Sequence, residues 1–156
     1  MTPRVNPYTA APALTKLLID YGTQVAKAAV GLEPKLVELV KIRASQINGC
    51  AMCLRMHTHE ARKKGESEER LYLLNAWRES PFYSERERAA LAWTEALTRV
   101  AETRAPDEDY GELARHFTDE EQVKVTMLIT AINSFNQLNV GFQLDPSLLE
   151  KLLAAA

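Results

Sequence analysis

The order of hydrophobic and polar residues predicts helices along the whole chain. Strand-like alternation is absent, and glycine, proline and capping residues divide the chain into segments. A first helix is predicted over about residues 11–30. Pro34 suits the first turn of a second helix over residues 36–47, and the Asn48-Gly49 pair interrupts that helix. The first third of the chain is therefore predicted to form two helices joined by a short connection.

The remainder of the chain is predicted to form further helices, each marked by a start or stop signal. A third helix starts near residue 50 and fades at Gly65, and a fourth starts at Ser67 and ends before Pro81. Two capping boxes, Ser84-x-x-Glu87 and Thr118-x-x-Glu121, open longer helices, while Pro106-Asp107 and Asp145-Pro146-Ser147 each open a short one. The segment over residues 123–142 is apolar on most sides, so it is predicted to be a central buried helix.

Length and organisation indicate one domain. The chain has 156 residues, which is enough to bury a substantial core. It shows no internal repeat, no low-complexity segment and no convincing domain boundary. We therefore predict an all-α fold in which residues 1–156 form a single bundle of about six to eight helices.

Composition and charge exclude several classes of function. Hydrophobic residues make up 46% of the chain and charged residues 26%, and the formal net charge is -2. There is no basic excess to bind nucleic acid, and no stretch is apolar for long enough to span a membrane. The first residues contain no apolar export segment, so the expected location is the cytosol, where a permanent structural disulfide is rare.

The candidate chemistry is concentrated in ASQINGCAMCLRMH, residues 44–57, which holds the only two cysteines of the chain. On a helical wheel of roughly 100° per residue, Cys53 lies at about −60° and His57 at about −20° from Cys50. Both sulfurs and the imidazole would therefore share one face of the third helix. His59 falls at about 180° on the same wheel and is interpreted as a solvated surface residue.

A zinc site and a redox couple both fit a C-x-x-C pair that is followed by histidine. A structural zinc site needs four ligands, usually from two separate pairs, but this chain has no second C-x-x-C, and His116 stands alone in a loop-like stretch. A redox couple needs less, because cysteines at i and i+3 in the first turn of a helix can close a disulfide without large backbone movement. We therefore expect no bound metal, with a metal-binding helical protein as an alternative.

Activation of either thiol requires help, because a free cysteine titrates at about pH 8.5. The positive end of the helix dipole favours a thiolate at Cys50. The spacing to His57 favours Cys53 instead, because one helical turn separates the two and proton transfer is easy over that distance.

Glu38 is the candidate that could hold His57 in the right tautomer. It belongs to the second predicted helix, which is apolar around most of its circumference, so its carboxylate is expected to be paired or functional. Spacing alone leaves two interpretations open. Glu38 either orients His57 or makes a surface ion pair with Lys41 or Lys35.

The arrangement of Glu38, eleven residues, Cys50-Ala51-Met52-Cys53, three residues and His57 resembles a family signature. It is similar to that of the alkyl hydroperoxidase D-like (AhpD-like) proteins of the carboxymuconolactone decarboxylase superfamily. The segments LVKIRASQINGCAMCLRMHTHEARKKGE, AWRESPFYSERERAALAWTEALT and AINSFNQLNVGF also resemble that family. The resemblance covers about residues 36–142 and implies an AhpD-like all-α fold, usually assembled as trimers or hexamers.

The resemblance also implies an activity. The best-known members reduce peroxides with the cysteine pair and recover through a disulfide, so peroxide and a dithiol donor are the expected partners. Cys53 matches the attacking thiol, Cys50 the resolving thiol, and His57 and Glu38 a proton relay. Met52 stands where the best-known peroxidase has an additional histidine, which implies a shorter relay here. Classical decarboxylases of the superfamily lack the cysteine pair, so decarboxylation is not expected.

These observations leave one leading hypothesis and one main alternative. No haem, flavin or nucleotide motif is visible, so no cofactor is expected. Several helices carry apolar residues on more than one side, which favours a homo-oligomer. The leading hypothesis is a cytosolic thiol peroxidase or disulfide oxidoreductase, and the alternative is a redox-sensing or interaction module that uses the same dithiol.

Overall fold

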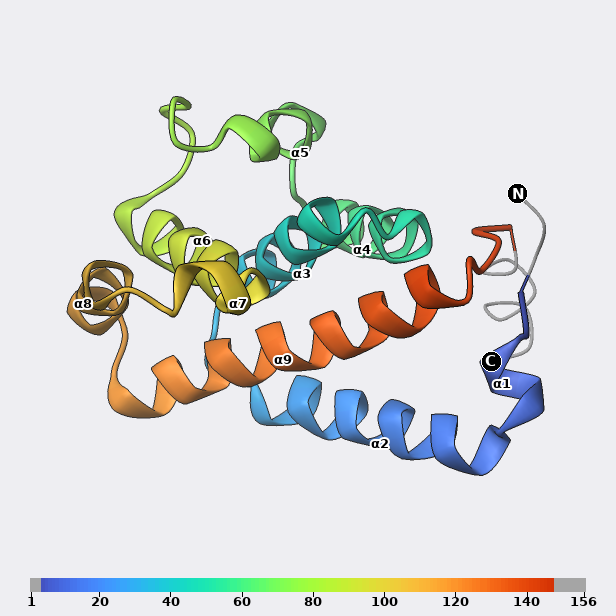
Figure 1. Cartoon of the computed structure of the whole chain (residues 1–156). Coiled ribbons are helices and arrows are strands. Elements are labelled where there is room, and N and C mark those ends of the chain that lie inside the picture. The colour runs from blue at the N-terminus through green and yellow to red at the C-terminus, as the bar shows by residue number, and fades with distance from the viewer. Residues whose placement is uncertain (1–3, 148–156) are drawn as a thin grey trace.

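The computed structural model describes residues 4–147, and that part of the chain contains nine α-helices, one 3-10 helix and no β-strand (Figure 1). The helices are α1 (Pro7–Ala10), α2 (Pro12–Ala28), α3 (Pro34–Asn48), α4 (Ala51–Lys63), α5 (Glu68–Leu73), η1 (Leu74–Ala76), α6 (Glu85–Thr98), α7 (Val100–Thr103), α8 (Asp107–His116) and α9 (Asp119–Gly141). The all-α prediction is confirmed, and the four-residue helices α1 and α7 add to the number expected. Within the described residues, no helix has the length and apolar character needed to cross a membrane.

α9 is the central helix of the fold, as predicted. It runs the length of the molecule in Figure 1, with α2 along one side and α3, α4 and α6 along the other. Its residues Val125, Leu128, Ile129 and Ile132 are buried, whereas Val123 is exposed. The side of α9 that faces α3 and α4 therefore borders the segment that carries the two cysteines.

α3 is a largely buried helix that packs against α9 on one side and against α4 and η1 on the other. It begins at Pro34, whose fixed φ suits a first turn, and it ends where Gly49 adopts a φ of 67°. That left-handed conformation costs little only for glycine, and it turns the chain directly into α4. Val40 packs in the cluster shared with α9, and Leu39 packs in the cluster shared with α4 and η1.

The capping signals identify the main helix starts, and two details differ from the prediction. The boxes that begin at Ser84 and Thr118 open α6 and α9. The fourth predicted helix is divided, because the α-helical turn of α5 tightens into the 3-10 helix η1 at Leu74. α8 extends to His116. The last predicted helix falls on residues 148–156, outside the described residues.

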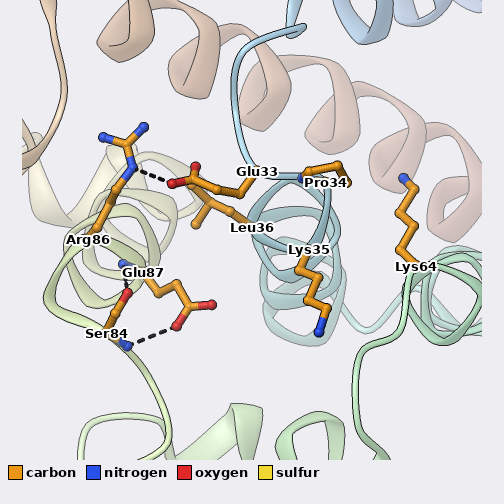
Figure 2. Close-up of a pocket in the computed structure, with 8 residues that line it drawn as sticks. All are labelled: Glu33, Pro34, Lys35, Leu36, Lys64, Ser84, Arg86 and Glu87. Atoms are coloured by element: carbon orange, nitrogen blue, oxygen red, sulfur yellow. Dashed lines mark hydrogen bonds and ion pairs between the residues drawn. The ribbon is translucent and has the colours of Figure 1, made fainter.

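A pocket of about 500 Å³ opens between the start of α3, the end of α4 and the start of α6 (Figure 2). Lys64, the residue that follows α4, also lines this pocket. On the opposite side, Arg86 donates through Nε to Glu33 at 2.9 Å. The pocket therefore presents charged side chains from three separate helical segments.

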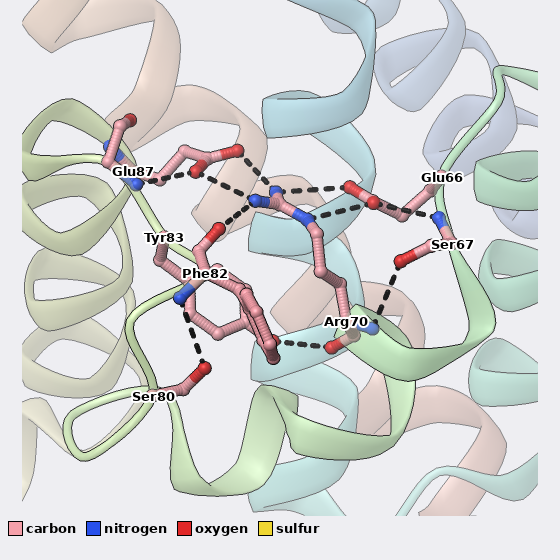
Figure 3. Close-up of polar contacts among 8 residues, drawn as sticks. Glu66, Ser67, Arg70, Ser80, Phe82, Tyr83 and Glu87 are labelled. Carbon is pink, nitrogen blue, oxygen red and sulfur yellow. Dashed lines mark hydrogen bonds and ion pairs between the residues drawn. The ribbon is translucent and has the colours of Figure 1, made fainter.

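A partly buried network of charged side chains ties the connection after α4 to the start of α6 (Figure 3). Arg70 Nε donates to Glu66 at 2.9 Å, and the same guanidinium donates to Glu87 and to the carbonyl of Phe82. The ring of Tyr83 lies 4.8 Å below the guanidinium carbon, and its hydroxyl donates to the carbonyl of Arg70. The network fixes α5 and η1 against the rest of the molecule.

Candidate redox site

The two cysteines lie at the junction of α3 and α4, directly after the turn at Gly49. Cys50 is the N-cap of α4, and its Sγ accepts a hydrogen bond from the backbone N–H of Cys53 at 3.4 Å. The two Sγ atoms are 2.7 Å apart, and both residues are free thiols that are almost completely buried. The sulfurs are therefore in direct contact and shielded from solvent.

Hydrogen bonding and burial act differently on the two thiols. The hydrogen bond with the Cys53 thiol and the backbone N–H of Cys53 together lower the pKa of Cys50 to about 7, against the effect of burial. The hydrogen bond with Cys50 and burial raise the pKa of Cys53. The first negative charge on the reduced couple therefore rests on Cys50, beside the positive end of α4.

Glu38 and His57 meet where α3 packs against α4. His57 Nδ1 lies 2.8 Å from Glu38 Oε2, while Glu38 Oε1 accepts hydrogen bonds from Lys41 at 3.2 Å and from Lys64 at 2.6 Å. Glu38 is only 2% exposed. The sequence left open whether Glu38 holds His57 or pairs with Lys41 or Lys35. In the structure it contacts both His57 and Lys41, and Lys64 is a partner that spacing did not indicate.

The charges around Glu38 determine the protonation state of the pair. Burial acts to raise the pKa of Glu38, but the hydrogen bond with His57 and the charges of Lys41 and Lys64 outweigh burial and lower the pKa to about 2. Burial lowers the pKa of His57 below 6.5, although Glu38 opposes that change. At neutral pH the pair is therefore a carboxylate and a neutral imidazole. Nδ1–H of the imidazole donates to Glu38, which leaves Nε2 free to accept a proton.

Asparagines of α9 form the polar surroundings of the dithiol, and sequence reasoning missed them. Asn139 Nδ2 donates to Cys53 Sγ at 3.3 Å, and Asn136 Nδ2 donates to Ser45 Oγ at 3.1 Å. Asn48, from the end of α3, donates to Asn136 at 2.9 Å. A signal was available, because asparagine recurs every third residue at positions 133, 136 and 139 of an otherwise apolar helix. The couple is thus surrounded by neutral amides rather than by cations.

The N-terminal segment also reaches the dithiol. The hydroxyl of Tyr8 donates to Asn139 Oδ1 at 3.2 Å, and Arg4 donates to the carbonyl of Gly141 at 2.7 Å. Burial and the negative charge that Cys53 and Cys50 would carry raise the pKa of Tyr8. No local sequence signal indicates these contacts, because more than 130 residues separate the partners.

Two small pockets border the candidate site. The first, about 240 Å³, is lined by Cys50, Met52 and Asn139 together with residues after α9 such as Leu144. The second, about 80 Å³, is lined by His57 and Lys41 together with apolar residues of α2 and α9. The thiol side and the imidazole side of the site therefore open onto different cavities.

The remaining histidines lie away from this centre. His59 is exposed, as predicted. The prediction that His116 lies in a loop-like stretch is wrong, because Leu113 is packed in the core and α8 continues through His116 before Phe117 becomes extended. Among residues 4–147, no three His, Cys, Asp or Glu side chains are grouped as ligands of one metal ion would be.

Comparison by sequence relates this chain to one family. The model of the "Carboxymuconolactone decarboxylase family" matches residues 12–96. The uncharacterised protein YdfG of Bacillus subtilis (strain 168) is 41% identical over 141 residues, which cover 90% of this chain and 95% of YdfG. The uncharacterised protein YnjA of Escherichia coli (strain K12) is 30% identical over 108 residues, which cover 69% of this chain and 59% of YnjA.

Solved structures show the same fold. ATU0492 of Agrobacterium tumefaciens, a protein of unknown function that is named as a candidate AhpD antioxidant defence protein, superposes with a TM-score of 0.88 at 45% identity, covering 92% of this chain and 97% of ATU0492. The debrominase Bmp8 shares the fold, with a TM-score of 0.77 at 22% identity over 88% of this chain and 72% of Bmp8. The matched family model, the sequence relatives and the fold agree, and the chain belongs to the carboxymuconolactone decarboxylase family as an AhpD-like protein.

Proposed function

We propose that this protein is a thiol-dependent peroxidase or disulfide oxidoreductase that uses Cys53 and Cys50 as its redox couple. The observation that carries the proposal is the contact of the two sulfurs, 2.7 Å apart, on the same helix as a neutral His57 held by Glu38. A thiolate is the group that attacks peroxide, and a base held by a carboxylate can generate it while the second thiol closes the disulfide. The likeness to ATU0492 supports an antioxidant role.

The two thiols supply both electrons and both protons that the proposed reduction of peroxide needs. The Cys53 thiolate attacks one oxygen of the peroxide, the O–O bond breaks, and Cys53 becomes a sulfenic acid while the alkoxide leaves. The Cys50 thiolate then attacks the Cys53 sulfur, the disulfide forms, and hydroxide leaves. The two electrons come from the couple, and its two protons end on the alcohol and on water. A dithiol donor of the cytosol then reduces the disulfide by exchange.

His57 and Glu38 supply the proton transfers of this scheme. Negative charge rests first on Cys50, so attack by Cys53 requires its proton to move to Cys50 or to His57. Cys53 and His57 are one helical turn apart, a distance that a direct or water-bridged transfer can cover. The carboxylate of Glu38 stabilises the imidazolium that then forms, while Met52 beside Cys50 offers no further base.

We also propose that the chain forms a homo-oligomer through the outer side of α2 and α9, as a trimer or a hexamer. Leu14 and Leu17 of α2 are 70% and 66% exposed, and Val123 of α9 is 62% exposed. An open groove of about 590 Å³ lies between the two helices and is lined mainly by apolar residues. Sedimentation at micromolar concentration tests this assembly. Leu17→Glu should shift it to smaller species, and a monomeric wild-type protein would refute it.

Steady-state reduction of hydrogen peroxide and cumene hydroperoxide, with dithiothreitol or dihydrolipoamide as donor, tests the proposed activity. Free thiols should fall from two to none per chain, without covalent dimers on a non-reducing gel, and each donor should restore them. Cys50→Ser should still be oxidised once at Cys53, whereas Cys53→Ser should lose fast oxidation. Oxidation without turnover would favour the redox-sensing alternative, and covalent dimers as the main product would contradict the proposal.

A further inference from the structure

The two sulfurs compete for one negative charge through different hydrogen-bond donors. Cys50 Sγ receives the backbone N–H of Cys53 at 3.4 Å, whereas Cys53 Sγ receives the side-chain amide of Asn139 at 3.3 Å. The backbone donor is fixed by the helix. The amide donor depends on which way the Asn139 side chain faces. A group that holds Asn139 therefore acts on Cys53 through a direct hydrogen bond, and the same amide also lowers the pKa of Cys50.

Tyr8 is the group that holds Asn139. Its hydroxyl donates to Asn139 Oδ1 at 3.2 Å, so the NH2 end of the amide is turned towards the Cys53 sulfur. If the amide rotated by half a turn, its carbonyl oxygen would face the sulfur and would repel a thiolate. Asn139 is 6% exposed, so water does not readily replace the tyrosine as partner.

We propose that Tyr8 is a positioning residue that stabilises the Cys53 thiolate through Asn139 and so counteracts the preference of the helix N-terminus for charge on Cys50. The inference rests on the redox function proposed above, since it concerns the attacking thiol of that scheme. Tyr8 does not touch the sulfurs through any hydrogen bond described, and its effect passes through the amide. The N-terminal segment thereby becomes part of the site, although it lies outside the residues matched by the family model.

The surroundings of the couple leave few other groups that could produce the same effect. From α1, Tyr8 is the titratable group whose pKa responds to the sulfurs. α4 contributes the two thiols themselves and His57, which is held by Glu38 of α3 with Lys41 and Lys64. α9 contributes neutral amides, because residues 133–141 contain no charged side chain. The hydrogen-bonded chain from Tyr8 through Asn139 therefore ends on the Cys53 sulfur, whereas the backbone N–H of Cys53 is donated to Cys50.

Single-cysteine proteins test this inference without peroxide. The pKa of Cys53 is measured in Cys50→Ser, and that of Cys50 in Cys53→Ser, from the pH dependence of thiolate absorbance and of iodoacetamide alkylation. Tyr8→Phe should raise the pKa of Cys53 by about one unit, which is roughly a tenfold loss of thiolate near neutral pH. The pKa of Cys50 should rise by less, because the amide also lowers that pKa but donates its hydrogen bond to Cys53. Tyr110→Phe, a half-exposed tyrosine on α8, is the matched control and should move neither value.

A double-mutant comparison shows whether Tyr8 acts through Asn139. In Asn139→Leu the pKa of Cys53 should rise, and adding Tyr8→Phe should raise it no further. Equal shifts at both cysteines, no shift at Cys53, or a full Tyr8→Phe effect in the Asn139→Leu protein would each overturn the inference. If Asn139→Leu does not fold, the inference is tested by the Tyr8→Phe variants alone. The rise in pKa that Tyr8→Phe causes must then be larger at Cys53 than at Cys50. A shift at Cys53 in a protein that peroxide fails to oxidise would refute the proposed function and leave the role of Tyr8 intact.

Discussion

Glu38 and Glu66 are both buried carboxylates, with 2% and 6% exposure. Their partners differ in whether they can gain and lose a proton near neutral pH. Glu66 accepts from Nε and Nη2 of Arg70 at 2.9 and 3.2 Å and from the backbone N–H of Ser67 at 2.9 Å. Glu38 accepts from an imidazole and two ammonium groups. A guanidinium stays charged at every accessible pH, whereas imidazole gains and loses protons near neutrality.

The comparison shows that burial and pairing alone do not identify a functional carboxylate. The Arg70 network fills its hydrogen-bonding capacity with groups that hold their protons, so it can only stabilise the fold (Figure 3). The Glu38 cluster contains His57, whose proton can move, and it lies beside two thiols in contact. The ability of the partners to exchange protons distinguishes a site for chemistry from a structural network.

The largest expected difference between the two carboxylates is in the rate of thiol oxidation. Glu38→Gln should slow oxidation by peroxide about 10²-fold, because an amide cannot stabilise the imidazolium of His57. The pH at which oxidation reaches half of its maximal rate should also rise, because His57 then takes the Cys53 proton less readily. Glu66→Gln, the matched control, should leave both quantities unchanged. Stopped-flow oxidation from pH 6 to 9 measures them, and equal rates for Glu38→Gln and wild type would remove Glu38 from the mechanism.

The second difference concerns stability in acid. The pKa of Glu38 is lowered to about 2 from 4.5, so its contribution to stability is fully present above pH 4.5 and is lost as the pH falls towards 2. The stability advantage of wild type over Glu38→Gln should therefore shrink across that window by an amount on the order of 3 kcal/mol. Urea unfolding of both proteins between pH 2.5 and 6 gives this difference. If the unfolding free energies of the two proteins changed in parallel with pH, Glu38 would have an ordinary pKa in the folded protein.

Glu66 should instead matter for stability at neutral pH. Glu66→Gln removes a buried charge that faces the partly exposed Arg70 and should cost about 2 kcal/mol in the free energy of unfolding. Burial opposes the charge of Arg70, but the hydrogen bonds with Glu87 and Glu66 outweigh burial and raise the pKa of Arg70. Denaturant unfolding at pH 7 measures the loss. A loss in Glu66→Gln that comes with slowed thiol oxidation would contradict the separation of the two clusters.

The sequence predicted those parts of the site that depend on spacing within one or two helices. Cys50, Cys53 and His57 follow from the periodicity of α4, and the turn between α3 and α4 follows from Asn48 and Gly49. Their roles in catalysis stay predictions. Spacing could not decide the partner of Glu38, because the approach of α3 to α4 is fixed by core packing and not by local signals.

The contacts of Asn139 and Tyr8 could not be predicted from the sequence, because they join segments that are far apart along the chain. Asn139 lies 86 positions after Cys53, and Tyr8 lies 131 positions before Asn139. Neither residue belongs to a recognisable local motif. Only the path of α9 beside α4, and the position of α1 at the end of α9, brings them to the sulfurs (Figure 1). The asparagine repeat of α9 was a visible but uninterpreted signal, because one polar residue in three also fits an ordinary helix.

The smallest expected effect comes from Lys64, which joins the Glu38 cluster to solvent. Its Nζ lies 2.6 Å from Glu38 Oε1, but its side chain is 35% exposed and lines the pocket of Figure 2. Lys41 and His57 still hold Glu38 when Lys64 is removed. Lys64→Gln should therefore cost less than about 1 kcal/mol of stability and change the oxidation rate by less than roughly threefold, as is typical of partly exposed ion pairs. Lys63→Gln, which removes an exposed pair with Glu60 on the same helix, is the control.

If Lys64→Gln slowed oxidation as much as Glu38→Gln, the ammonium would be passing protons between Glu38 and the pocket. The two clusters would then differ also in their access to solvent.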